Sequence, residues 1–182
     1  MALMYEVPQS LSPSRVDAFL SCPMAFRFAS IERLPEPPSV HTTKGSLVHR
    51  ALELLFTRPN AERTTEAARH AFERAMAEYA THPDYTLLGL DSAAARAFRD
   101  DAWALVEAYF AMEDPTAVRD IGLELRLEAK VDTLALRGII DRLELDHEGR
   151  LVVTDYKTGR SPGAKYEQSR LAGVHFYSFL CQ

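Results

Sequence analysis

The chain has 182 residues, of which 47% are hydrophobic and 26% are charged, and its formal net charge is −5 at pH 7. A chain of this length and composition is typical of one globular domain with a sizeable core. The acidic balance excludes a protein coated in basic surface, but it is compatible with nucleic-acid binding through a local basic groove or a bound metal ion.

The beginning of the chain predicts a short helix and carries no export signal. It lacks the basic start and long apolar run of a signal peptide, and no stretch of 18 apolar residues occurs anywhere. We therefore expect a cytoplasmic protein that makes no membrane contact. Ser12 and Pro13 predict a helix start, because serine caps a helix well and proline suits its first position. Pro23 is expected to break or kink this helix.

Apolar residues then recur at the spacing of one helix face in three further segments. We expect helices from about Thr43 to Thr57, from Glu62 to Ala80 and from Asp91 to just before Pro115. In the first of these, His49 and Glu53 are four residues apart and therefore share a face. The side chains expected in the cores of these helices are Leu52, Leu55, Phe56, Ala68, Phe72, Met76, Tyr79, Phe98, Trp103, Leu105, Val106, Tyr109 and Phe110.

After Pro115 the periodicity changes to two, which predicts a three-stranded antiparallel meander over residues 122–131, 133–146 and 150–157. A last helix is predicted from Tyr166 to Cys181. The expected fold class is therefore α/β (α+β): a small mixed sheet flanked by helices, with a helical insertion over residues 60–115. We expect a single domain over residues 1–182. Its last helix pattern meets no stop signal, so either the domain is cut short or it ends with this helix.

The last two predicted strands form a hairpin whose residues suggest a metal site. The connection over residues 147–149 ends in glycine, a common arrangement for a three-residue hairpin loop. If the flanking residues pair, Asp141 faces Asp155, and Lys157 points to the same face. Two opposed carboxylates repel each other, and a hard divalent cation between them would remove the repulsion. The alternative is a surface hairpin held by aspartate–lysine ion pairs.

His49 is a second candidate for metal binding, because Glu53 lies one turn away on the same helix face. A single helical histidine is more often an ordinary surface or core residue. The alternative for Glu53 is an exposed carboxylate, or an ion pair with Arg50 or Lys44. The spacing alone leaves both alternatives open.

Four motifs in order resemble the RecB-type branch of the PD-(D/E)XK nuclease superfamily, which includes AddB-like nuclease domains. They are LSPSRVDAFLSCPMAFRF, KGSLVHRALE, LRGIIDRLEL and VVTDYKTGR. The resemblance implies a restriction-endonuclease-like core. It also implies an exonuclease-like, metal-dependent enzyme of DNA repair and recombination that hydrolyses DNA at single strands or ends by a metal-activated water. Two alternatives stay open: a non-catalytic DNA-binding or scaffold module of a repair complex, and a Mg²⁺-dependent phosphoester hydrolase acting on a small substrate.

The resemblance also implies roles for individual residues. Lys157 would be the catalytic lysine, acting with Asp141 and Asp155. Glu53 would contact the metal ligands or bind the metal ion through a water molecule. Arg142 would balance the charge beside the metal-binding aspartate, and Gly45 would allow the start of its helix to approach the site closely. The ligands of Mg²⁺ or Mn²⁺ would be His49, Asp141, Asp155 and the main-chain carbonyl of Tyr156.

The last helix departs from the family pattern of Gln-x-x-x-Tyr. Tyr177 matches the tyrosine, but Gly173 occupies the glutamine position. Tyr177, Tyr166 and Arg170 are candidate DNA contacts, and the alternative for Tyr166 and Arg170 is ordinary helix surface.

The two cysteines bear on a possible iron–sulfur cofactor, and the absence of an ATP-binding motif bears on a possible helicase partner. In some relatives a cysteine at the place of Cys22 is one of four ligands of an iron–sulfur cluster, but this chain has only Cys181 besides. We therefore expect no such cluster within this chain and expect both cysteines to be buried. No Gly-x-x-x-x-Gly-Lys-Ser/Thr loop occurs, so any helicase partner would be a separate protein.

Overall fold

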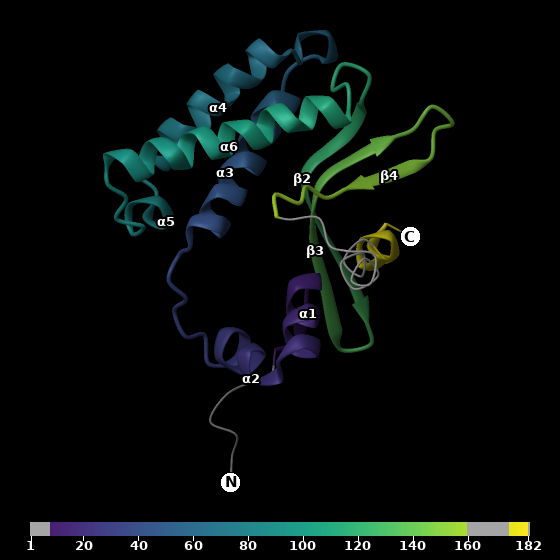
Figure 1. The fold of residues 1–182 in the computed structure, drawn as a ribbon. Helices are drawn as coiled ribbons and strands as arrows, with labels where there is room; N and C mark the ends of the chain where they lie inside the picture. Colours follow the sequence, from purple (N-terminus) through teal and green to yellow (C-terminus); the bar gives the residue numbers. More distant parts are fainter. Residues whose placement is uncertain (1–7, 160–174, 182) are drawn as a thin grey trace. The chain divides into compact units, whose positions relative to one another are not determined.

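A computed structural model describes residues 8–159 and 175–181 of the chain (Figure 1). The chain divides into two compact units. The first unit comprises Met1–Glu36, Leu125–Ile140 and Ser161–Gln182, and the second comprises Pro37–Glu124 and Asp141–Arg160. Strands β2 (Arg119–Val131) and β3 (Leu134–Leu145) contribute to both units. All the metal ligands expected from the sequence belong to the second unit.

The N-terminal segment of the first unit consists of short elements. They are β1 (Ser10–Leu11), α1 (Pro13–Ser21), α2 (Pro23–Phe26) and the π-helix η1 (Arg27–Ile31). The predicted start of α1 is confirmed, because the Ser12 side chain accepts a hydrogen bond from the Arg15 N–H and Pro13 takes the first helical position. β1 pairs in parallel with β3. The sequence did not predict β1, since two residues are too few to show an alternating pattern.

The expectation that Cys22 is buried is wrong. Cys22 is exposed, and Cys181 is half-buried. Cys22 forms the junction between α1 and α2, where its backbone is extended and its N–H donates to the Ala18 carbonyl. Because Pro23 starts a new helix directly after it, the thiol lies at a surface corner and not on a buried helix face.

The second unit is built on a group of helices, of which α3, α4 and α6 pack against one another (Figure 1). α3 begins earlier than the sequence predicted, because Ser39 and Thr42 form a capping box. α6 begins at the predicted cap, Asp91, whose carboxylate accepts two backbone N–H groups. The helices are α3 (Val40–Phe56), η2 (Asn60–Glu62), α4 (Thr65–Tyr79), α5 (Pro83–Thr86) and α6 (Ser92–Met112).

The core of the second unit contains the side chains that the helical spacing predicted. Burying each large apolar side chain stabilises the fold by about 1.5–3 kcal/mol, so this cluster is the main support of the helices that carry the site. Trp103 and Phe98 are part of the core, as expected. The predicted residues found buried are Leu52, Leu55, Phe56, Ala68, Phe72, Phe98, Trp103, Val106 and Tyr109. The other predicted core residues are only partly buried and pack against this cluster: Met76, Tyr79, Leu105 and Phe110.

The predicted hairpin is confirmed. β3 and β4 (Leu151–Thr154) pair antiparallel, with Arg142 opposite Thr154, which is the predicted register. The Asp146 N–H donates to the Arg150 carbonyl, and Gly149 has a φ of 79° that suits glycine in this loop.

β3 is the central strand of the described sheet, since it pairs with β1, β2 and β4. The described fold is thus mixed α/β with a small sheet, and α4 to α6 lie within the predicted insertion. Among the described residues, no helix is long and apolar enough to span a membrane.

Candidate metal centre

Three elements of the second unit bring potential metal ligands together. His49 comes from α3, Glu124 from β2 and Asp141 from β3, and one ligand atom of each lies within 4.8 Å of the other two. His49 Nδ1 lies 3.4 Å from Asp141 Oδ1, and the two side chains are 27% and 11% exposed. The group is therefore partly shielded from water but still reachable by a substrate.

The main chain of Tyr156 borders this group on two sides. Its N–H donates a hydrogen bond of 2.6 Å to Asp141 Oδ2, and its carbonyl oxygen lies 2.9 Å from His49 Nε2. Because a carbonyl can only accept, Nε2 carries the proton whenever this hydrogen bond forms. The Tyr156 carbonyl thus lies beside the group, and its role as a metal ligand stays a prediction.

The electrostatics of the group favour positive charge. Burial opposes a charged imidazole and lowers the pKa of His49. The hydrogen bond and charge of Asp141, the Tyr156 carbonyl and the charge of Glu124 nevertheless raise this pKa above its usual value. A field that stabilises an imidazolium also stabilises a metal cation at the same place.

The donor set fits a hard divalent metal ion. Two carboxylates, a main-chain carbonyl and an imidazole are ligands that Mg²⁺ or Mn²⁺ accepts. His49, Glu124 and Asp141 are therefore the residues best placed to hold such an ion.

Asp155 and Lys157 lie next in the chain but are arranged differently. Asp155 Oδ2 is 2.5 Å from Lys157 Nζ, and the Asp155 and Lys157 side chains are 15% and 61% exposed. This is the ion pair that the sequence left open as an alternative. Asp155 is outside the group of three, and the regular pairing of β4 ends at Thr154. Its role as a metal ligand and the catalytic role of Lys157 stay predictions.

Glu53 and Gly45 connect α3 to its surroundings. Glu53 pairs with Arg50 at 2.8 Å, one of the alternatives left open, and Arg50 also pairs with Glu78 of α4. At Gly45 an added Cβ would lie 2.9 Å from Thr158 Oγ1. The absence of a side chain thus lets α3 approach the segment after β4 closely, as the resemblance implied.

Glu124 is the member of the group that the sequence did not reveal. Simple alternation along β2 makes it an outward-facing strand residue between two leucines. Its backbone φ of 46° lies in the left-handed region and interrupts the regular strand conformation on which that alternation depends. Only a few per cent of residues other than glycine adopt this region. The only signal in the sequence was an acidic residue on the strand preceding the one that carries Asp141.

Arg142 and Tyr177 are the remaining predicted site residues that the structure describes. Arg142 is buried and pairs with Glu113 and Glu144, and its expected role in balancing the charge of the metal centre stays a prediction. In the first unit, an added Cβ at Gly138 would lie 2.7 Å from the Tyr177 ring, so this ring covers the backbone of β3. Residues 175–180 are helical. Tyr166, Arg170 and the rest of the predicted last helix lie outside the described residues.

Comparison with known proteins identifies the family. A model of the PD-(D/E)XK nuclease superfamily matches residues 10–182, whereas a search of curated proteins found no match. The mixed sheet flanked by helices agrees with the restriction-endonuclease-like fold of this superfamily, and the cluster of His49, Glu124 and Asp141 agrees with its use of divalent metal ions. The match covers nearly the whole chain, and the chain therefore belongs to the PD-(D/E)XK nuclease superfamily.

Proposed function

We propose that this chain is a metal-dependent deoxyribonuclease of the RecB-type branch, which hydrolyses DNA phosphodiester bonds in an exonuclease-like manner at single strands or ends. The observation that carries the proposal is the meeting of His49, Glu124 and Asp141 within 4.8 Å, in a chain that matches a nuclease superfamily along residues 10–182. The four ordered motifs support the RecB-type branch.

The proposed ligands of Mg²⁺ or Mn²⁺ are His49, Glu124, Asp141 and the Tyr156 carbonyl, with Asp155 joining them if its carboxylate leaves Lys157. A divalent cation bound there supplies Lewis-acid stabilisation of the phosphate and lowers the pKa of water. The protein's own contribution is to hold these donors in place. Asp141 is fixed by the Tyr156 N–H, and His49 is fixed between Asp141 and the Tyr156 carbonyl.

Lys157 is the proposed catalytic lysine. Its ammonium group is exposed, lies one residue after Tyr156 and is held by Asp155 at 2.5 Å. When a DNA phosphate enters, the same group can turn from Asp155 to the negative charge that develops during hydrolysis. The exposure of Lys157 supports this role, because a substrate can reach it without any change in the core.

The proposed setting is DNA repair or recombination in the cytoplasm, and it rests on the RecB-type motifs. The sequence has no phosphate-binding loop of the Gly-x-x-x-x-Gly-Lys-Ser/Thr type. A helicase, if the enzyme works with one, would be a separate protein.

A non-catalytic DNA-binding module is the second candidate, and one sequence observation favours it. The last helix has Gly173 where the family pattern has glutamine. A module of this kind would bind DNA without cleaving it, although it could still bind a metal ion.

Labelled single- and double-stranded DNA, incubated with the protein and Mg²⁺ or Mn²⁺, tests the proposal. Wild type should cleave, and Asp141→Asn, Asp155→Ala and Lys157→Ala should lose cleavage. Asp146→Asn is the matched control, since Asp146 is an aspartate of the same hairpin whose carboxylate binds Arg150 and the Glu148 N–H within the loop. Binding without cleavage would favour the second candidate. Hydrolysis of a small phosphodiester alone would favour a small-substrate enzyme.

A further inference from the structure

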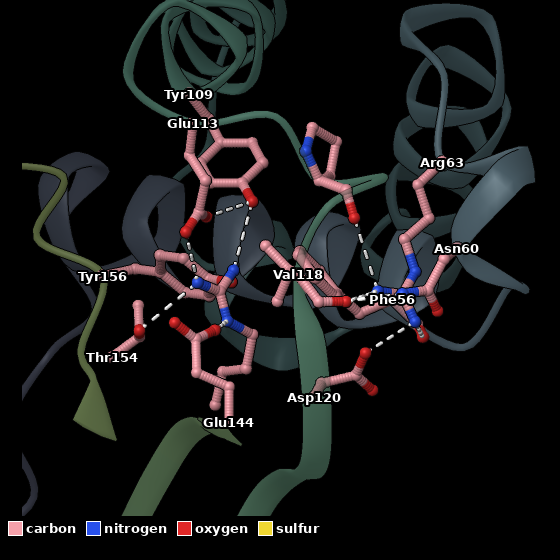
Figure 2. A network of polar contacts seen from close by, with 12 residues as sticks. Phe56, Asn60, Arg63, Tyr109, Glu113, Val118, Asp120, Glu144, Thr154 and Tyr156 are labelled. Carbon is pink, nitrogen blue, oxygen red and sulfur yellow. Dashed lines mark hydrogen bonds and ion pairs between the residues drawn. The ribbon is translucent and has the colours of Figure 1, made fainter. Parts of the chain in front are cut away.

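Two buried arginines, Arg63 and Arg142, lie against the aromatic ring of Phe56 in the second unit. Figure 2 shows Arg63 and Phe56 close together. The guanidinium carbon of Arg142 is 4.6 Å from the ring centroid, and that of Arg63 is 4.7 Å from it. Their exposed fractions are 0% and 3%. The two side chains have the same chemistry and nearly the same burial, but they are connected to different parts of the unit.

Arg63 has a structural role. It pairs with Asp120 at 2.6 Å, and its other donors bind main-chain carbonyl oxygens. These contacts tie the segment after α3 to the start of β2. None of the partners found for Arg63 in the described part of the chain is His49, Asp141 or Tyr156. The carbonyl oxygens belong to Phe56, Arg58, Pro115 and Val118.

Arg142 is connected to the metal centre. Its nitrogen atoms face two carboxylates and three hydroxyl groups, and one of these hydroxyls belongs to Tyr156. Figure 2 labels these partners, which are Tyr109, Glu113, Glu144, Thr154 and Tyr156. The pair with Glu144 is close but lacks the alignment of a hydrogen bond. The partner atoms are Tyr109 Oη (3.1 Å), Tyr156 Oη (3.0 Å), Glu113 Oε1 (2.8 Å), Thr154 Oγ1 (3.3 Å) and Glu144 Oε2 (2.6 Å).

Tyr156 joins Arg142 to the metal centre through its two ends. Its hydroxyl accepts from Arg142, while its main-chain N–H and carbonyl contact Asp141 and His49. Its ring also packs edge-on against His49 at 5.8 Å. Arg142 holds Thr154 as well, so the end of β4 is fixed at two alternate residues. The orientation of the Tyr156 peptide groups therefore depends on Arg142, which acts through the Tyr156 hydroxyl at the other end of the residue.

We propose that Arg142 is a positioning residue for the metal centre, acting through Tyr156. The inference rests on the proposed function and adds to it a residue that orients the metal ligands through a hydrogen bond to the Tyr156 hydroxyl. Groups that orient ligands through a hydrogen bond commonly change metal affinity or activity by about 10–100-fold when removed. Arginine suits this role because its planar fork offers five N–H donors, whereas a lysine offers three.

The test compares Arg142→Lys with Arg63→Lys, two substitutions that keep the charge at equally buried positions. Both variants are expected to lose thermal stability. Only Arg142→Lys should weaken Mn²⁺ binding, by about 10–100-fold in calorimetry at a temperature where both variants are folded. A loss of affinity that is equal in the two variants would overturn the proposal, because it would follow stability and not position.

Tyr156→Phe provides the milder variant in case Arg142→Lys does not fold. It removes only the hydroxyl that accepts from Arg142, and it should weaken Mn²⁺ binding in the same direction. The metal-free readout is the ring-nitrogen NMR signal of His49. This signal should change in Arg142→Lys and Tyr156→Phe and stay at its wild-type position in Arg63→Lys. An unchanged His49 signal in Tyr156→Phe would overturn the proposal.

The two proposals can fail separately. If the wild type neither binds Mn²⁺ nor cleaves DNA, the proposed function fails. The His49 signal in the metal-free variants would then still decide whether Arg142 positions Tyr156 and its two contacts.

Discussion

The two strands of the site hairpin carry their functional residues in different surroundings. On β3, Asp141 is 11% exposed and contacts both His49 and the Tyr156 N–H, and its neighbour Arg142 is fully buried. After β4, Lys157 is 61% exposed and pairs with Asp155. The difference suggests a division of labour. In this proposed division the β3 side, where Asp141 is held by hydrogen bonds, is preformed, whereas the Lys157 side is open to a substrate and can change partners.

Asp141→Asn is expected to have the largest effect, because it removes charge from the preformed side. The asparagine oxygen can still accept the Tyr156 N–H, so the fold should persist by circular dichroism. Losing a charged ligand costs several kcal/mol of stabilisation, or about 10³-fold or more in cleavage rate. Calorimetry should show Mn²⁺ binding lost together with cleavage. Unchanged metal affinity would contradict the ligand assignment.

Lys157→Ala tests the open side and should separate rate from metal binding. The side chain is mostly in water, so the free energy of unfolding should change by less than about 0.5 kcal/mol. Cleavage should fall by about 10²–10³-fold, the usual loss when one group that stabilises transition-state charge is removed. Mn²⁺ affinity should stay at the wild-type value. If metal binding falls in parallel with the rate, the division between the two sides is wrong.

Glu124→Gln sharpens the comparison by asking whether β2 belongs to the preformed side. The substitution keeps the shape of the side chain and removes its charge, so Mn²⁺ affinity should fall by about 10-fold or more. Glu128→Gln is the matched control, because Glu128 lies on the same strand and pairs with Arg137. Calorimetry that gives the same affinity for both variants would remove Glu124 from the site.

Glu124 also shows where reasoning from sequence stops. The hairpin could be predicted because its register is set locally, by a glycine in a three-residue loop and by alternation along two strands. The helices could be predicted because caps and apolar spacing are also local. The left-handed backbone at Glu124 could not be predicted from the local sequence, because its cost of about 1–3 kcal/mol must be offset by contacts with the surrounding structure.

Other differences between expectation and structure have the same origin. The two-residue strand β1 exists only because β3 offers it a partner. Cys22 was expected inside because free cysteines are usually buried, yet the two prolines around α1 and α2 leave it at a surface junction. The pairing of Lys157 with Asp155 was one of two alternatives that spacing could not separate. Each of these depends on which surfaces meet, and one-dimensional periodicity does not contain that information.

Asp146→Asn should have the smallest effect on function and a defined effect on stability, because Asp146 lies in the loop of the hairpin away from both sides. Its carboxylate accepts the Arg150 N–H, pairs with the Arg150 side chain and accepts the Glu148 N–H, and these bonds lower its pKa to about 2. A carboxyl group with a lowered folded-state pKa contributes stability above its usual pKa of about 3.9 and loses that contribution as the pH falls towards 2. Thermal unfolding measured between pH 2 and pH 5 should therefore be less pH-dependent in Asp146→Asn than in wild type. DNA cleavage at neutral pH should be unchanged. A loss of cleavage in this variant would mean that the loop, and not only the two sides of the hairpin, takes part in the reaction.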